Sequence, residues 1–124
     1  MDRNTLNSLH DLTDRVAIVT GGTRGIGKAI AEGFGLAGAK VAVASRKPDA
    51  CDAMAAHLRS MGVEAIGVPT HMADLGDIDN LVARTVETFG SIDIIVNGAA
   101  NALALPLGNL TEEAWAKSLD TNVR

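Results

Sequence analysis

Four short stretches of the chain are apolar at nearly every position instead of at alternate positions. Strands that are buried on both faces, as in a parallel sheet, have this pattern. The pattern therefore predicts four buried strands, at Val16–Thr20, Val41–Ser45, Ala65–Val68 and Asp93–Asn97.

Between these strands the apolar residues recur with the period of a helix. A glycine follows the end of each such segment, where the left-handed backbone of a helix C-terminus favours it. The predicted helices are Ile26–Leu36, Pro48–Met61 and Asp77–Phe89, with Asp74 as a candidate N-cap of the third. A fourth helix is predicted from Thr111, because apolar residues recur on roughly one face at Leu110, Trp115, Leu119 and Val123.

Strict alternation of strand and helix is typical of right-handed crossovers that build a parallel sheet with helices on both faces. We expect an α/β fold, a Rossmann-type doubly wound parallel sheet with the strand order 3-2-1-4, truncated after the fourth strand and the start of the fourth helix. Residues 1–14 are polar and without period, so they are expected to form an N-terminal tail ahead of one incomplete domain at residues 15–124.

Composition narrows the function classes. The 124 residues carry a formal charge of −4, 47% are hydrophobic, and no cluster of Lys or Arg marks a surface for nucleic acid or an anionic membrane. Cys51 is the single cysteine, which excludes a disulfide within the chain and favours a reducing, cytoplasmic setting. Neither a secretory signal nor a membrane-spanning stretch is recognisable.

A glycine-rich loop joins the first predicted strand to the first helix, with the sequence Thr20-Gly21-Gly22-Thr23-Arg24-Gly25-Ile26-Gly27. Gly21 would permit a sharp turn, Gly25 would let the main chain approach a pyrophosphate, and Gly27 would allow close helix packing. The following helix N-terminus adds unpaired N–H groups that favour an anion. The loop predicts a dinucleotide site in which Gly21, Thr23, Arg24, Gly25, Ile26 and Gly27 contact the cofactor.

The same residues allow a rival hypothesis. The stretch Gly22–Ala29 is one position short of a P-loop, which would bind MgATP or MgGTP. Ala29 stands where the P-loop needs a hydroxyl for magnesium, and the fourth strand ends in Asn97 rather than in an Asp. A nucleoside triphosphatase is therefore the less favoured alternative.

The end of the second strand indicates which dinucleotide is bound. An acidic residue there accepts from the ribose 2′-hydroxyl of NAD, but this strand ends Ser45-Arg46-Lys47, with no carboxylate. Arg46, aided by Lys47 and by Arg24 from the loop, would favour a 2′-phosphate. We expect NADP(H) to be preferred over NAD(H).

Three motifs together resemble the short-chain dehydrogenases/reductases. They are Thr20-Gly21-x-x-x-Gly25-x-Gly27, the strand end Ile95-Val96-Asn97-Gly98-Ala99-Ala100, and Trp115 with Asp120-Thr121-Asn122. The resemblance runs from Arg15 onward and covers the N-terminal half of such an enzyme. It implies hydride transfer between a nicotinamide ring and a carbonyl or alcohol carbon of a small molecule, a homo-oligomer when complete, and a catalytic role for Asn122.

The chain departs from the family pattern beside the cofactor. The family's Asn-Asn-Ala-Gly appears as Asn97-Gly98-Ala99-Ala100, and His71-Met72 stands where the family has Asp-Val beside the adenine. A histidine there could stack on the base or hydrogen-bond to it. The resemblance still implies that His71, Met72, Asn97, Gly98 and Ala99 belong to the cofactor site.

A further departure concerns catalysis. The chain has no tyrosine, so the family's Tyr-x-x-x-Lys pair is absent and we expect no appreciable turnover by these residues alone. We expect that the missing tyrosine is explained by the chain being a part of a longer oxidoreductase. The alternative is that the chain is a non-catalytic nucleotide-binding or regulatory module. The apolar strand Ile94–Val96 would then lie at a sheet edge, which predicts marginal stability, aggregation or assembly with a partner.

Overall fold

The computed structural model describes residue 2 and residues 9–98. Four parallel strands form one sheet in the order β3-β2-β1-β4. The elements are β1 (Val16–Thr20), α2 (Gly25–Leu36), β2 (Lys40–Ser45), α3 (Pro48–Ser60), β3 (Ala65–Pro69), α4 (Leu75–Phe89) and β4 (Ile94–Asn97). The predicted α/β fold and the predicted strand order are confirmed.

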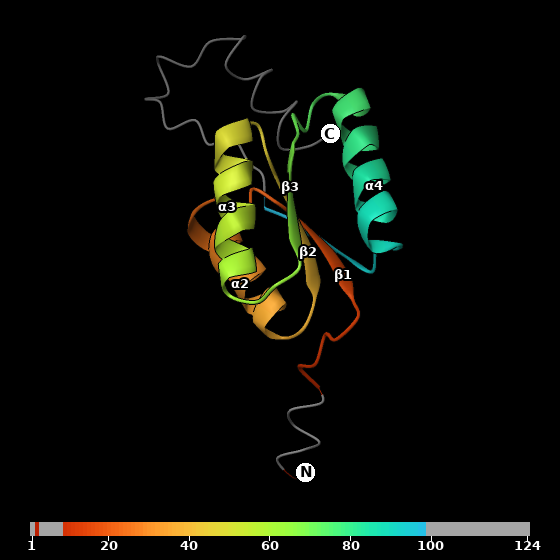
Figure 1. Cartoon of the computed structure of the whole chain (residues 1–124). Coiled ribbons are helices and arrows are strands. Elements are labelled where there is room, and N and C mark those ends of the chain that lie inside the picture. Colours follow the sequence, from red (N-terminus) through yellow and green to blue (C-terminus); the bar gives the residue numbers. More distant parts are fainter. Residues whose placement is uncertain (1, 3–8, 99–124) are drawn as a thin grey trace, which may run out of the picture.

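Helices cover both faces of the sheet. Figure 1 shows α2 and α3 on one face and α4 on the other. Successive strand residues point to opposite faces, so Val19 joins the core beneath α2 and α3 whereas Ile18 joins the core beneath α4. Since β1 and β2 are buried on both sides, an apolar residue is needed at each successive position, and this explains their unbroken apolar runs.

The strand β4 departs from this pattern. It pairs with β1 alone, and its burial alternates along the strand. Ile95 is opposite Ile18 in the register and is 59% exposed, while Ile94 and Val96 are partly buried. Within the described residues, β4 is therefore an edge strand with an exposed apolar side chain, as the sequence predicts.

The helix ends follow from local chemistry. The Asp74 carboxylate accepts hydrogen bonds from the N–H groups of Gly76 (2.8 Å) and Asp77 (3.2 Å), which confirms it as the N-cap of α4. This cap starts α4 at Leu75, earlier than the predicted Asp77. The predicted glycine punctuation also holds, because Gly38, Gly62 and Gly90 all have positive φ.

The segment before β1 contacts the body of the domain. The Leu12 N–H donates to the Ala37 carbonyl at 2.8 Å, and Leu12 packs against the core beneath α2 and α3. The predicted helix from Thr111, and with it Asn122, lies outside the described residues, as does Ala99. Among the described helices, none combines the length and the apolar character needed to cross a bilayer.

Candidate functional site

A cleft of about 580 Å³ opens at the carboxyl end of the sheet, where the glycine loop meets the ends of β2 and β3. The crossovers on either side of β1 lie on opposite faces of the sheet, so this is the topological switch point where doubly wound folds bind ligands. Its volume is within the range typical of small-molecule sites, about 300–1,000 Å³.

The cleft brings together most of the residues predicted from the sequence. Those that line it are Gly21, Thr23, Arg24, Gly25, Ile26, Gly27, Ser45, Arg46, Lys47, His71, Met72 and Gly98. Asn97 ends β4 as an exposed residue outside the lining, and Ala99 is not among the described residues.

Three lining residues were missed, namely Ala44, Ala50 and Thr70. Thr70 directly follows β3, and Ala50 lies in the first turn of α3. A topological signal could have found them, because the carboxyl ends of parallel strands and the helix starts that follow them share one edge of the sheet.

A backbone hydrogen bond holds the glycine loop against the end of β2. The Gly21 N–H donates to the Ala44 carbonyl at 2.8 Å, and the backbone turns through positive φ at Gly21 (69°) and Gly25 (60°). A Cβ on Gly27 would lie 2.0 Å from the Gly21 carbonyl oxygen, so the start of α2 packs too closely for any side chain. The predicted roles of Gly21 as a turn residue and Gly27 as a close-packing residue match this geometry.

Two helices begin at the cleft without a side-chain cap. The N-cap of α2 is Arg24 and that of α3 is Lys47, and neither side chain accepts a hydrogen bond from its helix. The helix α4, by contrast, is capped by Asp74. The first N–H groups of α2 and α3 are thus left without a side-chain acceptor, and such N–H groups favour an anionic ligand.

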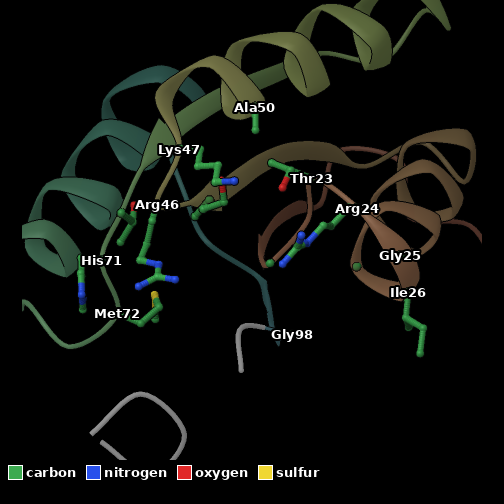
Figure 2. A pocket seen from close by; sticks show the side chains of 15 residues that line it. Thr23, Arg24, Gly25, Ile26, Arg46, Lys47, Ala50, His71, Met72 and Gly98 are labelled. Carbon is green, nitrogen blue, oxygen red and sulfur yellow. The ribbon is translucent and has the colours of Figure 1, made fainter. Parts of the chain in front are cut away.

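The side-chain charge at the cleft is positive. Arg24, Arg46 and Lys47 are all exposed, none forms an ion pair with a described residue, and no acidic side chain is among the lining residues that the structure describes. Figure 2 shows Arg24 and Lys47 extending toward the middle of the cleft from opposite sides, with the Arg46 guanidinium next to Met72. Such unpaired cations suit a ligand that carries several negative charges.

Hydrogen bonds fix the floor of the cleft between β1 and β4. The Thr20 hydroxyl donates to the Val96 carbonyl (3.1 Å) and accepts from the Gly98 N–H (3.0 Å). A Cβ on Gly98 would lie 2.6 Å from the Thr20 carbonyl oxygen. Gly98 is one of the positions at which the chain departs from the family pattern. Because it has no side chain, the backbone can pass close to the end of β1.

A second set of hydrogen bonds fixes the far wall, after β3. Thr70 is buried, and its N–H donates to the Ser45 carbonyl at 2.7 Å. The His71 N–H donates to the Asp77 carboxylate (2.9 Å), and the His71 Nδ1 accepts from the Ala73 N–H (3.1 Å). Both the backbone and the ring of His71 are thereby held in place at the cleft.

The described residues contain no group of three or more side chains suited to holding a metal ion. Cys51 is buried in α3, with its Sγ 3.4 Å from the Ser45 hydroxyl, so it packs in the interior as a small side chain.

Residues 15–124 match the family model for short chain dehydrogenase. The chain belongs to the short-chain dehydrogenase family. It is 43% identical over 114 residues to the Arabidopsis thaliana short-chain dehydrogenase/reductase SDRA, a match that covers 91% of this chain and 45% of that protein. It is 41% identical to the human dehydrogenase/reductase SDR family member 4, covering 91% of this chain and 41% of the relative.

A solved structure of a dehydrogenase/reductase from Sinorhizobium meliloti 1021 superposes with a TM-score of 0.89 at 30% identity, covering 96% of this chain and 48% of that chain. The chain therefore spans less than half the length of each of these relatives. In this chain, the helix starts of α2 and α3 that lack a side-chain cap, the glycine loop and the unpaired cations together suit a ligand that carries several negative charges.

Proposed function

We propose that this chain is the cofactor-binding part of an NADP(H)-dependent oxidoreductase that acts on a carbonyl or alcohol substrate. The observation that supports this proposal most directly is that Arg24, Arg46 and Lys47 line the cleft without an ion-pair partner among the described residues. No acidic side chain is among the described residues that line the cleft. A 2′-phosphate carries about −1.5 to −2 charges near neutral pH. A forked guanidinium at the end of β2 complements that charge, whereas the 2′-hydroxyl of NAD would call for an acceptor there.

In this proposal, different groups of the chain bind different parts of the cofactor. The backbone N–H groups of residues 21–27 bind the diphosphate at the start of α2, and Arg46 binds the 2′-phosphate with support from Lys47 and Arg24. Asn97, the last residue of β4, and Ala99 are assigned to the cofactor site, and Asn122 to the support of a water molecule. The bound nicotinamide would supply the hydride chemistry.

The sequence contains no tyrosine, so a phenolic proton donor of the family's kind is not among these residues. We expect the chain to bind the dinucleotide and to show no measurable reduction of carbonyl substrates. The complete enzyme is proposed to be a homo-oligomer. A non-catalytic nucleotide-binding module is the second candidate, and the missing tyrosine is the observation that favours it.

The test is a titration of the 124-residue chain with NADPH, NADH and MgATP, followed by fluorescence of the reduced nicotinamides and by calorimetry for MgATP. We expect NADPH to bind at least ~10-fold more tightly than NADH, which is the factor that one charge-assisted contact of about 1.5 kcal/mol supplies. MgATP should not bind measurably at the same concentrations. Equal binding of NADH and NADPH would overturn the NADP(H) assignment, and preferential binding of MgATP would overturn the dinucleotide assignment.

A further inference from the structure

The cleft contains a methionine that an oxidant entering from solvent can reach. Met72 lines the cleft after β3, and its side chain is partly exposed. The other described methionines lie outside the cleft lining: Met54 is 4% exposed, and Met61 packs against the core beneath α2 and α3. A thioether enclosed in a core is shielded from oxidants, so we expect Met72 to react before these two.

The ends of β2 and β3 bring this methionine close to an unpaired cation. The Thr70 N–H donates to the Ser45 carbonyl at 2.7 Å, so the pairing of β2 with β3 continues to the point where both strands enter the cleft. Arg46 follows β2 directly, and Met72 lies two residues beyond Thr70. Figure 2 shows the Met72 sulfur next to the Arg46 guanidinium, on one side of the cleft.

A thioether and a sulfoxide differ in what they offer to a guanidinium. The methionine sulfur is a weak acceptor, and Arg46 has no ion-pair partner among the described residues, so the donors of Arg46 are available in the reduced chain. Hydrogen peroxide transfers one oxygen atom to the sulfur. The O–O bond breaks, an S–O bond forms, the sulfur loses two electrons, and the second peroxide oxygen leaves as water. The sulfoxide is polar, and its oxygen is an acceptor.

We propose that Met72 is an oxidation site whose sulfoxide accepts hydrogen bonds from the Arg46 guanidinium and so weakens the binding of a phosphate there. The effect on the choice of cofactor rests on the proposed function, in which Arg46 binds the 2′-phosphate. The sulfoxide oxygen would occupy donors that the phosphate needs, and it would place the negative end of the S–O dipole against the phosphate. Methionine sulfoxide reductases regenerate the thioether, so the change is reversible.

Two variants at position 72 separate oxidation from loss of the side chain. Met72→Leu keeps a similar apolar volume and cannot be oxidised. Met72→Gln places a carbonyl acceptor near the position of the sulfoxide oxygen without any oxidant. Met61→Leu is the matched control, because Met61 is partly buried against the core and lies outside the cleft lining.

The first measurement needs no cofactor. Each chain is treated with hydrogen peroxide, peptide mass spectrometry follows the oxidation of each methionine, and NMR follows the Arg46 Nε–H resonance, which is identified by its loss in Arg46→Gln. We expect Met72 to be oxidised at least ~3-fold faster than Met54 and Met61, because of its place in the cleft. The Arg46 resonance should shift on oxidation in the wild-type chain and in Met61→Leu, but not in Met72→Leu.

The second measurement is a fluorescence titration with NADPH and NADH before and after peroxide treatment. We expect oxidation to lower the NADPH affinity of the wild-type chain and of Met61→Leu by about 3- to 10-fold, the range of one net hydrogen bond, and to change NADH affinity by less than ~2-fold. Treated and untreated Met72→Leu should bind NADPH equally. Untreated Met72→Gln should already show the lowered preference for NADPH, and sulfoxide reductase should restore the affinity of the oxidised wild-type chain.

The outcomes separate this inference from the proposed function. If Met72 is oxidised no faster than Met61, or if its oxidation leaves the Arg46 resonance in place, the inference is wrong whatever the cofactor. If the resonance shifts but the preference for NADPH over NADH is unchanged, the control of cofactor choice by Met72 is wrong while the proposed function stands. If NADPH fails to bind the untreated chain, the proposed function fails, and the Arg46 resonance still decides whether the sulfoxide binds Arg46.

Discussion

At the scale of single residues, the cleft combines fixed and free side chains. His71 and Thr70 are held by hydrogen bonds to neighbouring backbone, whereas Arg24, Arg46 and Lys47 are exposed and have no ion-pair partner among the described residues. Exposed charges interact weakly with one another in water, but they remain available to a multiply charged ligand. The fixed residues can therefore set the shape of the site, and the free cations can set its preference for charge.

Replacing Arg46 tests whether the exposed cations set the preference of the site for a more highly charged ligand. Arg46→Gln removes the charge and the forked donor next to the proposed 2′-phosphate, so we expect NADPH affinity to fall about 10-fold, which corresponds to ~1.4 kcal/mol. NADH affinity should stay within ~2-fold. Fluorescence titrations at fixed ionic strength measure both constants.

Arg84→Gln is the matched control, because Arg84 is an exposed arginine of α4 outside the cleft. This control should bind both dinucleotides as the wild-type chain does. Equal losses for NADPH and NADH in Arg46→Gln would contradict a specific contact between Arg46 and the 2′-phosphate.

At the scale of elements, the start of α2 lies so close to the backbone of the glycine loop that a side chain at Gly27 would not fit. The Gly27 Cα faces the Gly21 carbonyl, and a methyl group added at Gly27 would meet that oxygen at 2.0 Å. Gly33 in the same helix has nothing within 4 Å of such a group. The two glycines therefore have opposite consequences when they are replaced by alanine, although they are in one helix.

Gly27→Ala should destabilise the domain by about 3 kcal/mol, the upper end for an overpacked site, because the obstructing atom belongs to the backbone. Gly33→Ala should stabilise it by about 0.5–1 kcal/mol, since alanine is the better helix former and meets open space. Urea unfolding followed by circular dichroism measures both changes. Similar effects of the two substitutions would contradict the close packing of α2 on the glycine loop.

The start of α4 depends on one carboxylate. Asp74→Ala removes the acceptor for two N–H groups, so we expect a loss of about 1 kcal/mol in the free energy of unfolding. Asp79→Ala, at an exposed position of the same helix, is the control and should change stability by less than about 0.5 kcal/mol. An unchanged stability in Asp74→Ala would show that the cap contributes nothing to α4.

At the scale of the whole molecule, the described sheet has two well-covered central strands and two edges. β1 and β2 lie at its centre, while β4 exposes Ile95 on the same face as α4. Val82 and Val86 on α4 are also partly exposed. Exposed apolar side chains beside an unpaired strand edge favour contact with another chain.

Ile95→Lys should therefore reduce self-association of the chain without a loss of folded structure, because the side chain is mostly outside the core. Sedimentation velocity over a range of concentrations measures the association. Leu36→Lys is the control, an exposed leucine at the end of α2 away from the sheet edge, and should leave association unchanged. Equal effects of the two variants would indicate general hydrophobic association rather than pairing at β4.

The fold could be predicted closely because its signals are local. The strands β1 and β2 are buried on both faces, and their unbroken apolar runs show this in the sequence. The helices end in left-handed backbone, and the glycines that follow them show this too. The start of α4 was placed two residues late, because an N-cap acts on the N–H groups directly after it whereas the apolar period becomes visible only further along. The missed lining residues Ala44, Ala50 and Thr70 carry no charge or motif, so only their place in the sheet reveals them.

The sequence by itself determined the class of fold, the glycine loop and the basic residues after β2, because these depend on the chemistry and order of neighbouring residues. The tertiary structure decided which distant segments share the cleft, since that depends on the register of β1 with β2 and β4 and on the face that each helix crosses. It also decided that the His71 Nδ1 is occupied by the Ala73 N–H, and that Ile95 is exposed while Ile18 beside it is buried. The sequence shows the first group of features because the period of apolar residues along a chain follows from which side chains are buried. It does not show the second group, because the hydrogen-bond partner of a polar atom is fixed only when the backbone has folded around that atom.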